Sequence, residues 1–175
     1  MSKTARATAS EFGGVLYTLA ELIAQDLSRR MEAFTDQTGI WETPEYRDEL
    51  IIAIALGFDL ILHRDLDNQS HGRSSEIRDS FKDHMLSKML DEGASVDETN
   101  QIDSFIANRH AKYAALLTTD GSTISKEGVQ RFAREVFLNV MGPVERNPAA
   151  ELAIGIHFMG IMKQFVTIGS QYEVV

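Results

Sequence analysis

Cysteine is absent from the 175 residues of the sequence. Its absence excludes disulfide bonds, thiolate nucleophiles and zinc sites built from cysteine ligands. A chain without cysteine is compatible with a reducing compartment, and the first ten residues, MSKTARATAS, contain no apolar segment of the kind that a secretory signal needs. We therefore expect a cytoplasmic protein.

Positive charge is scarce. Lysine and arginine number 17 against 26 aspartates and glutamates, which gives a formal net charge of -9. On average such a chain repels a polyphosphate rather than attracting it. We expect no nucleic-acid partner.

No apolar run is long and pure enough for a membrane span. The run from Leu50 to Leu62 covers 13 residues, against about 20 needed to cross a bilayer, and it contains Asp59. The stretch 149–169 is longer but includes charged side chains such as Lys163. We expect no membrane span and interpret both stretches as helices of a protein core.

Motifs of the common enzyme classes are also missing. The chain contains no nucleophile elbow, no Walker A loop, no dinucleotide glycine pattern and no HExxH pair. The letters His63-Arg64-Asp65-Leu66 match the start of a kinase catalytic loop, but Ser70 stands where that loop needs asparagine. We interpret the match as chance. No catalytic residue is predicted, and the chain gives no positive indication of an enzyme.

Metal sites are not predicted either. Asp120, Gly121 and Glu127 match three places of an EF-hand calcium loop, but its first place holds the apolar Leu116. A polar turn followed by Ser125 as a helix cap explains the same residues better. The five histidines lack the spacings of zinc and di-iron motifs. We therefore predict no metal and no cofactor.

Helical periodicity is the main signal that is present. Apolar residues recur at steps of three and four in successive segments, and no window shows the sustained alternation of a strand. Thr8 with Glu11, and Ser95 with Glu98, have the spacing of capping boxes that begin helices. The sequence therefore predicts an all-α fold with about six helices.

Two of the predicted helices are apolar on every side. They cover about 44–65 and 148–169, and a helix without a polar face must be largely enclosed by its neighbours. We expect a single-domain bundle over 1–175, with flexible tails at 1–7 and 171–175.

The chain has few amphipathic helices that could cover the two apolar ones. Only about four amphipathic helices remain to enclose two apolar ones, so we expect part of the apolar surface to face a second copy of the chain in a two-fold dimer. Gly155 and Gly160 would allow a close helix approach, either within one subunit or across the dimer.

Arg109 is the most unusual side chain, because it lies on the apolar stripe of its helix. A guanidinium there must be paired or must point into a cavity or an interface. Asp59, the only charge within the central apolar run, is the obvious partner, and we predict a buried or half-buried salt bridge between the two. The alternative is that Arg109 presents a bidentate donor to a carboxylate or phosphate of a ligand.

Two further residues complete the candidate ligand-binding group. His63 follows Asp59 by one helical turn, and Tyr113 follows Arg109 by one turn. The candidates are therefore Asp59, His63, Arg109 and Tyr113. His157 stands apart from them, and we expect it to be a neutral core histidine whose protonation lowers stability below about pH 6.

Two functions follow from this pattern. The leading hypothesis is a non-catalytic helical module that acts through self-association and through binding of a protein partner. The alternative is a helical bundle that binds or senses a small molecule in an apolar cavity lined by methionine and phenylalanine, with the four candidates as its polar end.

Overall fold

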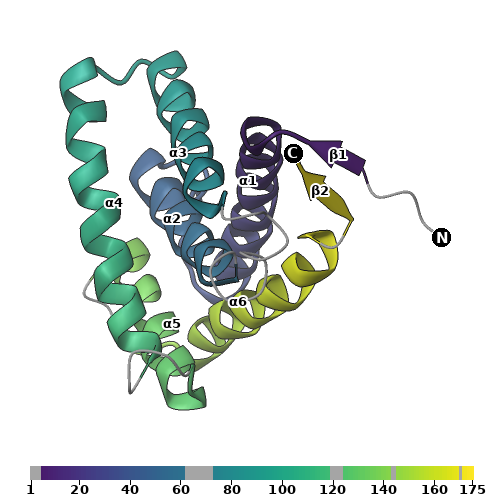
Figure 1. Ribbon diagram of the computed structural model, residues 1–175. Coiled ribbons are helices and arrows are strands. Elements are labelled where there is room, and N and C mark those ends of the chain that lie inside the picture. The colour runs from purple at the N-terminus through teal and green to yellow at the C-terminus, as the bar shows by residue number, and fades with distance from the viewer. Residues whose placement is uncertain (1–4, 62–72, 119–123, 143–144, 170) are drawn as a thin grey trace.

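The computed structural model describes residues 5–61, 73–118, 124–142, 145–169 and 171–175. Within these ranges the chain forms six helices, which confirms the predicted all-α bundle, and one small two-stranded sheet (Figure 1). In chain order the elements are β1 Ala5–Ala7, α1 Ala9–Phe34, α2 Pro44–Ile61, α3 Ser74–Asp91, α4 Val96–Leu117, α5 Lys126–Met141, α6 Pro148–Gly169 and β2 Tyr172–Val174.

The helix starts follow the capping residues of the sequence. Thr8 caps α1 and Ser95 caps α4, and in both cases the glutamate three residues later accepts a hydrogen bond from the backbone N–H of the cap. Ser125 Oγ accepts a hydrogen bond from the Gly128 amide at the start of α5. The interpretation of Ser125 as a helix cap is confirmed, while residues 119–123 of the rejected calcium loop lie outside the described residues.

Helix α2 is the centre of the bundle. It packs against α1, α4, α5 and α6. Its aliphatic side chains are each 2 % exposed or less at Leu50, Ile51, Ile52 and Ile54. Burying one such side chain stabilises the fold by roughly 2 kcal/mol, so this segment anchors the core. The helix begins at Pro44 as predicted, and residues 62–65 of the predicted range lie outside the described residues.

Aromatic rings join α2 to the last two helices. The rings of Phe58 and Phe165 stack with their centroids 4.7 Å apart, and those of Phe132 and Phe158 are 4.4 Å apart. Gly57 makes room for this packing, since a Cβ there would lie 3.1 Å from Phe158 Cε2. The core is thus continuous from α2 through α6 to α5.

Helix α6 is enclosed on one side only. Its inner side chains Ile154, Phe158, Ile161 and Phe165 are buried. On the other side Leu152 is 62 %, Ile156 61 %, Met159 47 % and Val166 40 % exposed. The enclosure expected for 148–169 is therefore incomplete within one chain, because the neighbours α1, α2 and α5 cover only the inner side.

The same helix is long and apolar enough to cross a membrane, over Pro148–Ile168, and it is the one such helix in the described part of the chain. Length and composition alone support this, and the core helix of a bundle meets the same criterion. The inner side of α6 carries the aromatic core, so packing accounts for the apolar side chains on that side of the helix.

The two ends of the described chain are paired with each other. β1 and β2 form a parallel ladder in which Ala5 lies opposite Tyr172 and Ala7 opposite Val174 (Figure 1). Val174 is buried, and the Tyr172 ring lies 5.2 Å from that of Phe12. This pairing corrects the expectation of loose tails over 5–7 and 172–174. The physical reason is that Tyr172 and Val174, two residues apart and so on the same face of the strand, both pack against the core, Tyr172 against Phe12 near the start of α1.

Candidate functional site

The predicted salt bridge between Asp59 and Arg109 does not form. Arg109 Nε lies 3.0 Å from Glu49 Oε2, and Asp59 Oδ1 lies 2.8 Å from Arg78 Nε. Glu49 and Asp59 are about 15 Å apart along α2 at 1.5 Å per residue, so an arginine on α4 that reaches one carboxylate cannot reach the other. The four candidates are therefore not one group, and His63 lies outside the described residues.

Glu49 is the centre of a buried polar cluster that joins three helices. Its side chain is 4 % exposed and accepts hydrogen bonds from Arg109 Nε and from the Tyr113 hydroxyl. Asn139 Nδ2 on α5 donates to Glu49 Oε1 at 3.2 Å and to the Tyr113 oxygen at 2.8 Å. Burial raises the pKa of Tyr113, and the adjacent Glu49 carboxylate adds to this, so the hydroxyl remains a donor.

This Glu49 cluster is a structural crosslink rather than an open site. Removing one member would leave a buried charge or polar group without its partner, which is strongly destabilising. Of the ligand candidates, Arg109 and Tyr113 thus hold α4 against α2 and α5. The sequence offered a signal for Asn139, an amide between the apolar Val136 and Val140 on one helical stripe.

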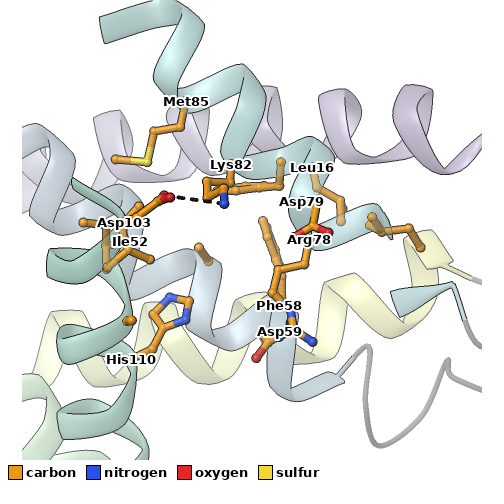
Figure 2. Close-up of a pocket in the computed structure, with 15 residues that line it drawn as sticks. Leu16, Ile52, Phe58, Asp59, Arg78, Asp79, Lys82, Met85, Asp103 and His110 are labelled. Carbon is orange, nitrogen blue, oxygen red and sulfur yellow. Dashed lines mark ion pairs between the residues drawn. The ribbon is translucent and has the colours of Figure 1, made fainter. Parts of the chain in front are cut away.

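Asp59 lies instead at a cavity between α2, α3 and α4 (Figure 2). The cavity has a volume of about 440 Å³. Its apolar wall includes Leu16, Ile52, Phe58, Phe81, Met85 and Ile106. Its polar groups include Asp59 with Arg78, Lys82 with Asp103, and His110. Of the polar residues expected at the end of an apolar cavity, Asp59 lines this one, whereas Arg109 and Tyr113 belong to the Glu49 cluster.

His110 is the residue of this cavity that sequence reasoning undervalued. Its Nε2 atom is buried and has no hydrogen-bond partner within the described part of the chain. Burial lowers the pKa of His110, and this effect outweighs the opposing effects of the Asp59 carboxylate and the Ile52 backbone. The imidazole is therefore neutral at neutral pH.

The exposed side of α6 is the second candidate surface. Leu152, Ile156, Met159, Lys163 and Val166 follow one another at spacings of four and three, and all are exposed. We call these five residues the outer stripe of α6. A groove of about 670 Å³ separates it from α5, and one of about 400 Å³ lies on its α1 side. Ile156 lines both grooves and stands as a ridge between them.

The two glycines of α6 have different surroundings. A Cβ at Gly155 would lie 3.3 Å from Val129 Cγ1, so Gly155 serves the packing of α6 against α5 within the chain. A Cβ at Gly160 would meet nothing within 4 Å. Of the two close-approach positions predicted, only Gly160 is open to a second molecule.

His157 is not the core histidine that was expected. Its side chain is 18 % exposed, and its Nε2 lies 2.9 Å from Asp26 Oδ2 on α1. This hydrogen bond, with a second from Arg30, holds the pKa of Asp26 below its usual value. The stability that this contact supplies is lost as Asp26 itself becomes protonated in acid.

Within the described ranges, no three histidine, aspartate or glutamate side chains gather into a group that could hold a metal ion. No protein-family model matches the chain, and no curated protein and no solved structure is significantly similar to it.

Proposed function

We propose that this protein is a non-catalytic helical module of the cytoplasm that pairs with a second copy of itself through the outer stripe of α6. The observation that carries the proposal is the exposure of Leu152, Ile156, Met159 and Val166 on a helix whose other side is core. Contiguous exposed apolar surface of this kind is typical of an interaction site.

The spacing within the stripe favours another helix as the partner. Positions 152, 156, 159, 163 and 166 alternate steps of four and three, which is the seam of a left-handed helix pair. The ridge at Ile156 lies between two grooves, so each copy in a two-fold pair offers the other both a ridge and a groove.

The charge of the stripe also permits self-association. The nearest carboxylate of α6 within the grooves is Glu151, which is buried and paired with Arg134 and Arg146. The stripe itself carries one charge, that of Lys163, and a single lysine at a seam position sets the register of a helix pair at some loss of stability.

The size of the expected gain shows how large the interface must be. About half of each of the four apolar side chains remains to be buried, which contributes roughly 1 kcal/mol per side chain. The total of roughly 4 kcal/mol only reaches the lower end of the cost of association. The interface must therefore extend beyond the stripe to the flanking edges, including Leu22 on α1, which is 60 % exposed and lines the second groove.

The test is the oligomeric state of two matched variants. Ile156→Glu places a charge on the ridge, and we expect it to weaken the dimer at least a hundredfold, because the glutamate must be desolvated in the interface. Val96→Glu is the control, since Val96 is 65 % exposed and lies at the α3–α4 turn, far from α6 (Figure 1). Sedimentation over a range of protein concentrations measures both dissociation constants.

A monomeric parent protein at all concentrations would overturn the proposal, as would an equal loss of association in both variants. If the parent protein is monomeric but binds a helix with the same seam pattern, the outer stripe binds a different protein and not a second copy of this chain.

A further inference from the structure

We propose that the cavity between α2, α3 and α4 is a binding site for a small neutral molecule with an apolar body and one hydrogen-bond donor, which His110 Nε2 accepts. The site is separate from the outer stripe of α6, so it stands or falls independently of self-association. It rests on the cavity, on the lone imidazole nitrogen and on the arrangement of charges around them.

The dimensions and walls of the cavity suit a small apolar ligand. Its volume of about 440 Å³ falls within the range of ligand pockets. Phe58 from α2 and Phe81 with Met85 from α3 form much of the apolar wall. Methionine and aromatic side chains adapt to the shape of a planar or aliphatic body, so the wall supplies affinity without fixing one structure.

His110 supplies a polar acceptor deep in the site. Figure 2 shows the imidazole reaching from α4 toward Phe58 and Asp59. Its Nε2 atom is buried without a partner among the described residues. A buried polar atom without a hydrogen bond carries a cost in free energy, because it has lost its contact with water. A ligand that donates a hydrogen bond to this atom offsets the cost, so it is bound more tightly than a purely apolar ligand. A neutral imidazole accepts from a hydroxyl or an amide N–H.

The charges at the cavity favour a neutral ligand. Arg78 Nε pairs with Asp59 at 2.8 Å, and Lys82 Nζ pairs with Asp103 at 3.5 Å (Figure 2). An anionic ligand would also meet the carboxylate of Asp79, which lines the same space. The cations are thus already paired with carboxylates, and among the described residues that line the cavity no cluster of positive charge selects a phosphate or carboxylate.

Three probes that share one ring system test this chemistry. 1-Naphthol carries the donor, naphthalene lacks it, and 1-naphthoate replaces it with a negative charge. We expect 1-naphthol to bind about tenfold more tightly than naphthalene, the effect of one buried hydrogen bond, and 1-naphthoate to bind most weakly. Titration calorimetry gives the affinities, and the ¹⁵N chemical shift of His110 Nε2 reports the contact directly.

Two pairs of variants locate the site. Ala107 lines the cavity and Ala111, one turn later on α4, does not, and both are exposed. Ala107→Phe should fill the space and reduce the binding of 1-naphthol and naphthalene at least tenfold, while Ala111→Phe leaves both unchanged. His110→Phe keeps the ring but removes the acceptor, so it should abolish the preference for 1-naphthol over naphthalene.

The proposal is overturned if no probe binds at millimolar concentration, or if both alanine variants alter binding equally. It is also overturned if His110→Phe weakens naphthalene as much as 1-naphthol. If His110→Phe does not fold, the alanine pair and the ¹⁵N shift of the parent protein still decide the question.

Discussion

At the scale of single residues, the choice of charge partner depends on position along the helix axis. The sequence predicts that Arg109 needs a partner, and the partner is Glu49 rather than Asp59. Sequence patterns place a residue on a helix face and cannot give the level at which two helices cross. Glu49 directly precedes the apolar run and is itself buried, whereas Asp59 near the other end of the run meets Arg78.

Asp48, next to Glu49, is expected to make stability fall as the pH rises. Burial raises the pKa of Asp48 to about 6 from 3.8, with the Glu92 carboxylate adding to the shift and Arg47 opposing it. Because the folded protein binds this proton more tightly than the unfolded chain, the contribution is complete below about pH 4 and is lost as the pH rises through about 6. Asp48→Asn should therefore stabilise the protein by about 2 kcal/mol at pH 8 and hardly at pH 4.

Urea unfolding at the two pH values measures this difference. Asp83→Asn, an exposed position on α3, serves as the control and should leave stability nearly unchanged at both. A gain from Asp48→Asn that is equal at pH 4 and pH 8 would contradict the raised pKa.

At the scale of elements, local patterns predicted the helices well and their surroundings less well. The Thr8 and Ser95 capping boxes and the start of α2 at Pro44 depend on neighbouring residues, and all three were predictable. The pairing of β1 with β2 joins segments from the two ends of the described chain, and three-residue strands give almost no periodic signal. The exposure of one side of α6 could not be predicted either. An apolar helix has the same sequence pattern whether the residues that pack on it come from its own chain or from another molecule.

Two helical glycines should respond in opposite directions to substitution by alanine. A Cβ at Gly128 would lie 2.1 Å from the Leu117 carbonyl oxygen, whereas one at Gly160 would meet nothing within 4 Å. Gly128→Ala should therefore destabilise the fold by about 2 kcal/mol or more, since backbone at the α4–α5 joint must move. Gly160→Ala should stabilise it by about 1 kcal/mol through helix propensity.

Both substitutions are best measured by thermal and urea unfolding in the Ile156→Glu background, in which the proposed association is weakened. A loss of stability from Gly160→Ala in that background would contradict the inference that a Cβ at Gly160 meets no other atom.

At the scale of the whole molecule, Lys163 indicates the orientation to expect in the proposed pair of chains. In a parallel pair of α6 helices each Lys163 would lie beside its own copy. In an antiparallel pair centred on Met159, the two lysines would be about 12 Å apart along the axis, at 1.5 Å per residue. Repulsion between the two Lys163 ammonium groups is weaker at this separation than side by side, so it favours the second arrangement.

Single cysteines distinguish the two orientations cleanly, because the parent chain has none. In the antiparallel pair, Met159→Cys should form a disulfide between copies, while Leu152→Cys should not, because its two copies would be about 21 Å apart. Non-reducing electrophoresis after mild oxidation reads out both. Efficient crosslinking through both positions would instead indicate parallel helices.

The ladder between residues 5–7 and 172–174 makes the fold a closed loop held by a non-covalent clasp. During translation the helices can form in succession as they leave the ribosome. β1, however, has no partner strand until almost the whole described chain has been synthesised. Ala7 and Val174, both buried in this clasp, therefore acquire their cover last. The clasp can therefore form only after the chain has been synthesised through residue 174.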